Sequence, residues 1–142
     1  MIKVSKIDFF KIFRYNLIRK TRKKGNSMRV IIAGSRTFNN YGYFKEKMLE
    51  IQKQIDIDEI ISGVAKGPDI MGIYWGDKHN IPVKKFYADW DKYGNVAGYI
   101  RNTEMAEAAD YLIAFWDGKS KGTKHMIDTM RRQHKHGIVF LF

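Results

Sequence analysis

The chain has 142 residues, a length that suits one domain, and its hydrophobic content of 44% is ordinary for a globular protein. It contains no cysteine, which excludes disulfide bonds, thiolate metal sites and a cysteine nucleophile. The net charge of +11 is unevenly spread, because residues 1–27 carry nine Lys/Arg against one acidic residue, while the rest carries 17 against 14. The strong basicity therefore belongs to the N-terminal segment.

Residues 1–27 interleave apolar and basic residues at roughly helical spacing, which predicts a basic amphipathic helix. The segment has no apolar run of membrane-spanning length and lacks the apolar core and cleavage site of a signal peptide. Two interpretations stay open. Either this helix contacts nucleic acid or an anionic membrane, or Met28 is the natural start and the segment is an accessory extension. We expect a cytoplasmic protein whose folded domain covers residues 28–142.

From residue 29 onward, short apolar runs alternate with stretches of helical periodicity. The predicted strands cover residues 29–33, 59–62, 81–86, 111–115 and 138–142. The predicted helices cover about 41–55, 68–79, 99–109 and 123–134, and a polar loop covers 87–98. This alternation predicts a Rossmann-like three-layer α/β sandwich, with about five parallel strands and helices on both faces of the sheet.

Three of the predicted strands are followed by loops that combine glycine with hydroxyl or basic residues. These loops are 34–37 (GSRT), 63–69 (GVAKGPD) and 117–123 (DGKSKGT). In a parallel sheet they share the edge formed by the carboxyl ends of the strands, where ligands bind. Glycine permits close approach to a ligand, and free N–H groups at helix starts bind anions. The sequence therefore predicts phosphate-binding loops, although neither G-x-G-x-x-G nor a P-loop motif is present, which argues against an ordinary NAD enzyme or ATPase.

Two further features lie near the same predicted edge. Arg101 and Glu104 are three residues apart on one helical face, where they form either a surface ion pair or a site in which Arg101 binds phosphate. Trp90 and Trp116 lie in predicted loops, where each either stacks on a base or packs against the protein.

Five stretches of the sequence together resemble the SLOG superfamily, and most closely its small YspA-like branch, which is common in bacteria and phages. They are 32–36 (IAGSR), 62–69 (SGVAKGPD), 86–90 (FYADW), 97–105 (AGYIRNTEM) and 122–123 (GT). They occur in the family's order and cover nearly all of residues 28–142, while residues 1–27 have no counterpart. The resemblance implies a Rossmann-like domain that binds a nucleotide or a nucleotide-derived signal.

The resemblance also bears on catalysis. The related LOG phosphoribohydrolases, formerly called lysine-decarboxylase-like, cleave the N-glycosidic bond of nucleoside monophosphates. They use the arginine of R-x-x-E-M and the last glutamate of P-G-G-x-G-T-x-x-E. Arg101, Glu104 and Met105 match the first motif, but Met126 stands where the second has its glutamate. Methionine can neither activate water nor support an oxocarbenium-like sugar. This favours a binding domain, and the alternative is a hydrolase whose carboxylate comes from Asp69 or Glu104.

These arguments define one candidate site. The candidate catalytic residues are Arg101, Glu104 and Asp69. The candidate ligand-binding residues are Gly34, Ser35, Arg36, Gly63, Ala65, Lys66, Gly67, Asp69, Trp90, Arg101, Asn102, Gly118, Gly122 and Thr123. We expect no cofactor and, since His134 and His136 have no third ligand nearby, no metal. An exposed apolar helix face would permit a homodimer, because relatives commonly pair through helices.

Overall fold

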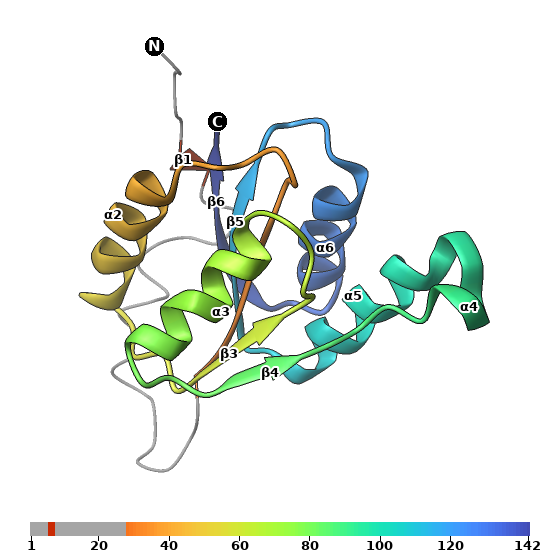
Figure 1. Cartoon of the computed structure of the whole chain (residues 1–142), viewed down its shortest axis with the longest axis horizontal. Helices are drawn as coiled ribbons and strands as arrows, with labels where there is room; N and C mark the ends of the chain where they lie inside the picture. Colours follow the sequence, from red (N-terminus) through yellow and green to blue (C-terminus); the bar gives the residue numbers. More distant parts are fainter. Residues whose placement is uncertain (1–5, 8–27) are drawn as a thin grey trace.

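A computed structural model describes residues 6–7 and 28–142 of the chain, and it contains a six-stranded sheet (Figure 1). The strands are β1 (Lys6–Ile7), β2 (Arg29–Gly34), β3 (Glu59–Ser62), β4 (Val83–Lys85), β5 (Tyr111–Trp116) and β6 (His136–Leu141). Their order is β1-β6-β5-β2-β3-β4, in which the five strands β2 to β6 are parallel and β1 pairs antiparallel with β6. The predicted Rossmann-like class is confirmed.

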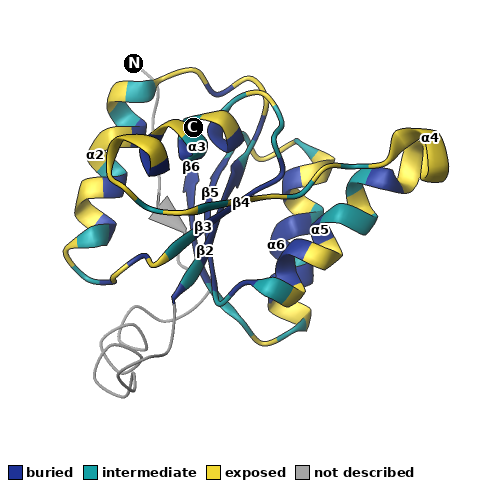
Figure 2. Ribbon diagram, turned by 60° about the horizontal axis from the view of Figure 1, so that its bottom comes forward, coloured by how far each residue is buried: buried dark blue, intermediate teal, exposed yellow. Residues whose placement is uncertain are grey.

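Helices cover both faces of the sheet (Figure 2). One face carries α2 (Tyr41–Gln52) and α3 (Pro68–Lys78), and the other carries α5 (Ala97–Ala108) and α6 (Lys121–Arg132). The chain builds β2, β3 and β4 outward in one direction, then returns through α5 to place β5 on the other side of β2. The strand order therefore reverses between β2 and β5, the position where open α/β sheets bind ligands.

The middle strands are apolar without interruption because both of their faces are buried. Along β2, Val30 and Ile32 pack into the core beneath α2 and α3, whereas Ile31 and Ala33 pack into the core beneath α5 and α6. Helix α6 contributes Met126 to the second core. These two cores hold the carboxyl ends of β2 and β5 side by side, in the register that pairs Gly34 with Phe115.

The structure departs from the sequence predictions at the edges of the sheet. Strand β4 has three residues and ends the sheet, in keeping with Pro82 directly before it. The predicted polar loop at 87–98 contains a short helix, α4 (Trp90–Tyr93), and a 3₁₀ turn, η1 (Gly94–Val96). The prediction missed α4 because it is a single turn, which is stabilised by Asp89 accepting a hydrogen bond from the backbone N–H of Lys92 at 3.0 Å.

The helix predicted for residues 1–27 lies outside the described residues, apart from Lys6–Ile7, which form strand β1. The proposed contacts of that segment with nucleic acid or membrane stay predictions. Among the helices of the described residues, none combines the length and apolarity required to cross a membrane.

Candidate functional site

A cavity of about 410 Å³ lies at the carboxyl ends of β2 and β5, where the strand order reverses. Its walls come from the loop after β2, the loop between β3 and α3, the segment from α4 to α5, and the loop between β5 and α6. The predicted site residues that line it are Gly34, Ser35, Arg36, Ala65, Asp69, Trp90, Arg101, Asn102, Gly122 and Thr123. The structure thus brings ten of the predicted residues to one hollow.

Two glycines bring the first two loops together. A Cβ atom on Gly34 would lie 2.3 Å from the carbonyl oxygen of Phe115 and 2.6 Å from Cγ of Pro68, so the end of β2 meets both β5 and the start of α3. Gly67 has a φ angle of +94°, and a Cβ atom there would lie 2.9 Å from the carbonyl oxygen of Ser35. A side chain at either position would separate these loops.

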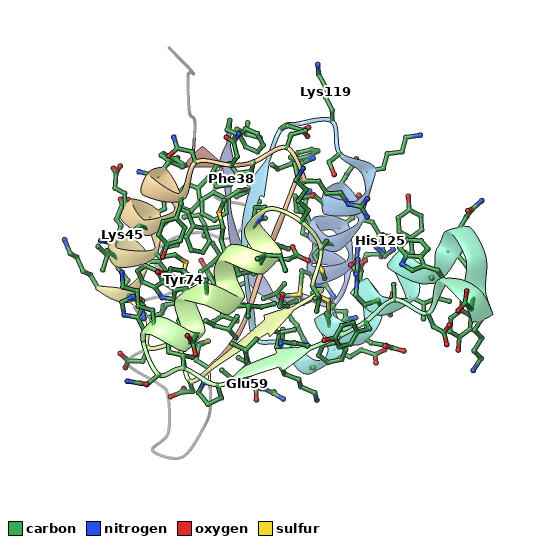
Figure 3. All side chains as sticks on the ribbon, viewed as in Figure 1. Phe38, Lys45, Glu59, Tyr74, Lys119 and His125 are labelled. Atoms are coloured by element: carbon green, nitrogen blue, oxygen red, sulfur yellow. The ribbon has the colours of Figure 1, made fainter. Side chains whose placement is uncertain are left out.

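Asp117 joins the first loop to the last. Its Oδ1 accepts hydrogen bonds from Ser35 Oγ at 3.1 Å and from the backbone N–H groups of Lys119 at 2.9 Å and Ser120 at 2.8 Å. Burial opposes ionisation of Asp117, but the hydrogen bonds from Ser120, Lys119 and Ser35 outweigh it, and its pKa is below the usual value. A charged Asp117 therefore fixes the rim at neutral pH. The side chain of Lys119 points outward from this loop (Figure 3).

Arg101 reaches from α5 to the loop after β3. Its Nη1 donates a hydrogen bond to the carbonyl oxygen of Gly63 at 2.7 Å. Its Nε is buried and has no hydrogen-bond partner among the described residues. A Cβ atom on Gly63 would lie 3.1 Å from Cζ of Arg101 and 2.9 Å from Oδ2 of Asp69, so both side chains lie over this glycine. Arg101 and Gly63, which are 38 positions apart in sequence, therefore meet at the carboxyl edge of the sheet. The positions of the predicted loops had placed both residues at this edge.

Asp69 is a carboxyl group enclosed in the wall of the cavity, with only 5% of its surface exposed. Its Oδ2 accepts a hydrogen bond from the backbone N–H of Ala65 at 3.1 Å. Burial raises the pKa of Asp69 from 3.8 to about 6, and the Ala65 hydrogen bond and the charges of Arg101 and Arg36 limit the rise. Burial also lowers the pKa of Arg101, against the attraction of Asp69. Asp69 is thus a group that exchanges its proton near neutral pH.

The start of α6 presents backbone donors to the cavity. Ser120 precedes the helix without capping it through its side chain, and its Oγ lies 3.2 Å from Thr123 Oγ1. The N–H groups of residues 121–123 have no acceptor within the part of the chain that the structure describes. Because Gly122 and Thr123 line the cavity, these unpaired donors lie at its wall, at the positive end of the helix dipole.

Asn102 connects α5 to this helix start. Its Nδ2 donates to the carbonyl oxygen of Gly122 at 3.1 Å and lies 3.3 Å from Nδ1 of His125. The ring of His125 stacks on Tyr99 with centroids 4.3 Å apart, on the side of α6 that faces α5 (Figure 3). Burial, followed by the charge of Arg132, lowers the pKa of His125, so a neutral ring accepts from Asn102 at neutral pH.

Other predicted residues lie outside the cavity lining. Gly63 and Gly67 lie directly against side chains and backbone that line the cavity, whereas Lys66 and Gly118 are exposed. Glu104 is exposed on α5 and does not line the cavity, so Arg101 and Asp69 are the candidate catalytic residues that do.

The two tryptophans that were predicted in loops lie in regular elements, Trp90 at the start of α4 and Trp116 at the end of β5. Trp116 does not line the cavity and donates from Nε1 to the carbonyl oxygen of Ser120 at 3.1 Å, whereas Trp90 lines it and is 52% exposed. Met126 lines the cavity as part of the apolar core.

The candidate list omitted several lining residues, chiefly Asn95, Tyr99, Asp117 and Ser120, although Asp117 and Ser120 lie in the predicted loop 117–123. Asp117 had a usable signal, since an aspartate directly after a buried strand and before Gly-Lys-Ser is typical of a side chain that bonds to backbone N–H groups two and three residues on. Asn95 had none, because it lies in η1 directly after α4, which was itself missed, whereas Tyr99 lies in the helix predicted from residue 99.

Sequence comparisons with known proteins identify the family of this chain. The sequence profile of the YspA, cpYpsA-related SLOG family matches residues 28–93. The Gene 61 protein of Mycobacterium phage D29 is 32% identical over 117 residues, which cover 78% of this chain and 91% of that protein. The chain belongs to the YspA, cpYpsA-related SLOG family. No solved structure matches it significantly.

The SLOG profile covers only part of the rim of this SLOG domain. Its matched stretch includes the loops after β2 and β3, and it ends at α4. Arg101, Asn102 and the start of α6 lie beyond the matched residues. The contact of Arg101 with Gly63 therefore joins the part that the SLOG profile recognises to the part that it does not.

Proposed function

We propose that this SLOG-family domain binds a nucleotide or nucleotide-derived ligand in the cavity at the ends of β2 and β5, with a phosphate group held by Arg101 and the start of α6. One observation carries the proposal: the buried Nε of Arg101 has no partner among the described residues, in a cavity that three strand-end loops enclose. Such an orphaned donor is costly unless a ligand accepts from it.

The volume of the cavity and the donors that line it suit a phosphate-bearing small molecule. The cavity volume of about 410 Å³ lies within the range of small-molecule sites. Arg36 and Arg101 supply two positive charges beside the carboxyl groups of Asp69 and Asp117, and the free N–H groups of residues 121–123 add neutral donors. Phosphate oxygens suit both kinds of donor. A domain of this kind acts as a sensor if occupancy of the cavity follows the ligand's concentration.

Calorimetric titration with AMP and ADP-ribose tests the proposal. The substitution Arg101→Gln should weaken binding by about 10-fold or more, because it removes a charge-assisted contact with phosphate. The matched control is Lys45→Gln, which removes the same charge from α2 on the other side of the sheet (Figure 3). We expect that control to change the affinity by less than about two-fold.

Two results would contradict the proposal. One is a wild-type protein that binds neither AMP, ADP-ribose nor adenosine. The other is equal binding of AMP and adenosine, since adenosine lacks the phosphate that the rim is proposed to hold.

A second candidate function is hydrolysis of an N-glycosidic bond, and it is favoured by the position of Asp69. A carboxyl group with a pKa of about 6 beside Arg101 suits general acid–base chemistry near neutral pH. In this reaction water supplies a hydroxyl group to the sugar's anomeric carbon and a proton to the departing base. Met126 stands where the related hydrolases have their glutamate, which argues for binding without turnover.

Incubation with nucleoside monophosphates, followed by chromatography for free base, separates the two functions. The hydrolase predicts release of base by the wild type and its loss in Asp69→Asn with AMP affinity retained. If the wild type binds AMP and releases no base, the domain binds without hydrolysis.

A further inference from the structure

The exposed apolar side chains of this domain gather in one segment. Of the eight large hydrophobic residues exposed among the described residues, five lie between residues 87 and 99. This segment contains α4 and η1, and α4 projects beyond α5 at one end of the molecule (Figures 1 and 2). Trp90 and Tyr99 line the cavity, whereas Tyr93 does not. Exposed aromatic surface next to a polar cavity indicates a contact with something other than solvent.

Local structure holds the indole of Trp90 in place. Asp89 caps the turn that Trp90 begins. The edge of the indole lies over Gly98, where a Cβ atom would be 3.4 Å from Cη2 of Trp90 and 3.8 Å from Nη2 of Arg101. The aromatic ring and the guanidinium group therefore meet over one glycine at the start of α5. A ligand that places an anion at Arg101 has the indole of Trp90 beside it.

The three tryptophans of the chain differ in whether the indole ring is exposed for stacking on a ligand. Trp75 is fully buried and donates from Nε1 to Gln52 at 3.1 Å, and Trp116 donates to the carbonyl oxygen of Ser120. Trp90 is half-exposed, and its Nε1 has no acceptor among the residues that the structure describes. Only Trp90 combines an exposed ring with a position in the cavity wall.

Two more residues complete this end of the cavity. The ring of Tyr99 stacks on the ring of His125, and Tyr99 lines the cavity. Asn95, in η1, lines the cavity with an amide that makes no hydrogen bond to the described residues. An amide both donates and accepts, which matches the edge of a nucleobase.

We propose that Trp90, Asn95 and Tyr99 form a base subsite in which Trp90 stacks on a nucleobase and Asn95 bonds to its edge. This deepens the proposed function and rests on it, because the phosphate subsite at Arg101 sets the distance and direction of the base. The ligand class becomes a nucleotide with an intact base, rather than a sugar phosphate.

The test compares two ligands that share a phosphate and a ribose, AMP and ribose 5-phosphate, by calorimetry. The wild type should bind AMP about 10-fold more tightly or better, because stacking on an aromatic side chain contributes on the order of 1–3 kcal/mol. Trp90→Ala should remove most of this difference by weakening AMP, while the affinity for ribose 5-phosphate changes by less than about two-fold.

Two further variants separate stacking from general disturbance of the segment. Tyr93→Ala removes an exposed aromatic ring from the same helix outside the cavity, and it should leave both affinities unchanged. Trp90→Phe should retain most of the preference for AMP, since it keeps an aromatic face. Asn95→Ala should bring the affinities for AMP, GMP, CMP and UMP closer together than they are in the wild type. Thermal unfolding of each variant checks that the fold persists.

The outcomes distinguish the two proposals. If AMP and ribose 5-phosphate bind the wild type equally, or if Trp90→Ala weakens both equally, the base subsite is wrong while phosphate binding at Arg101 stands. If Tyr93→Ala acts like Trp90→Ala, the loss comes from disturbance of the segment rather than from stacking on Trp90, and the base subsite is wrong. If the wild type binds neither AMP, ADP-ribose, adenosine nor ribose 5-phosphate, the proposed function is wrong and the base subsite is wrong with it.

Discussion

The charged side chains at the two ends of the parallel sheet differ in how fully they are paired. At the amino end, Asp110 accepts from the backbone N–H of Arg29 at 2.9 Å and from its Nε at 3.2 Å, and Asp58 accepts from the N–H of Met28 at 2.6 Å. At the carboxyl end, Nε of Arg101 is buried with no partner among the described residues, and Asp69 is a buried carboxyl group. The charged groups at the amino end are paired, whereas at the carboxyl end Arg101 retains one unpaired donor, although Asp117 there still binds the chain.

This difference has an energetic meaning. A buried polar group left without a partner costs about 1–3 kcal/mol, so its persistence in a fold requires either compensation or a ligand. The two apolar cores on the faces of the sheet supply the compensation. Under the proposed function, the carboxyl end is the place where stability is given up for binding, as is common at functional sites.

The largest expected effect comes from Gly34, where the two loops and β5 touch. Gly34→Val should lower the free energy of unfolding by about 4 kcal/mol or more, because its side chain would meet the Phe115 carbonyl and Pro68. Urea denaturation measures this. The control is Gly122→Ala, whose Cβ would meet nothing within 4 Å and should shift stability by less than about 1 kcal/mol. A stable Gly34→Val variant would mean that the rim is less tightly packed than the structure has it.

Asp69→Asn should stabilise the protein in a pH-dependent way. Burial raises the pKa of Asp69 in the folded state to about 6, whereas the pKa in the unfolded state is the ordinary 3.8. The wild type therefore loses stability as the pH rises from 3.8 to about 6. At pH 8 the neutral variant should be more stable by up to about 3 kcal/mol. At pH 3.5 most of the gain should disappear, because wild-type Asp69 is then protonated in the folded state and mostly protonated in the unfolded state. Equal gains at the two pH values would show that ionisation is not the cause.

Val64 gives a smaller test of strain at the rim. It follows Gly63 with a φ angle of +60°, a conformation that β-branched residues rarely adopt. Val64→Asn should raise the free energy of unfolding by about 1 kcal/mol, since asparagine adopts this conformation more readily. Thermal denaturation provides the measurement, and a loss of stability would show that packing of the Val64 side chain outweighs its backbone strain.

The smallest effect is expected at the amino end. Asp110→Asn weakens the half-exposed ion pair with Arg29, which should lower stability by less than about 1 kcal/mol. Its effect on AMP affinity should be within about two-fold, because the pair lies at the opposite end of the sheet from the cavity. A large loss of AMP affinity would remove the distinction between the two ends.

Most of the fold follows from local patterns. The β-branched and apolar runs predicted all five parallel strands, and helical spacing predicted α2, α3, α5 and α6. Strand β4 was predicted at twice its observed length, as six residues instead of three, because an edge strand has little burial to show in its pattern. The single turn α4 escaped prediction because its cap, Asp89, is one side chain with no periodic signal.

The candidate site was predictable in part for a similar reason. Gly34, Gly122 and Arg101 lie beside predicted strand ends or helix starts, whose positions in a parallel sheet are known once the fold class is known. Asn95 could not be placed, because its position depends on the missed turn. The sequence did not show that Arg101 and Glu104 diverge, since Arg101 turns toward Gly63 while Glu104 is exposed.

The sequence by itself determined the fold class and which loops lie at the carboxyl ends of the strands, because burial and strand crossovers leave few other arrangements. Tertiary structure alone decided that Arg101 meets Gly63 and Asp69, and that Trp90 rather than Trp116 lines the cavity. Those contacts join residues far apart in the chain. Their geometry depends on how closely α5 and the β3–α3 loop approach each other, which no local pattern encodes.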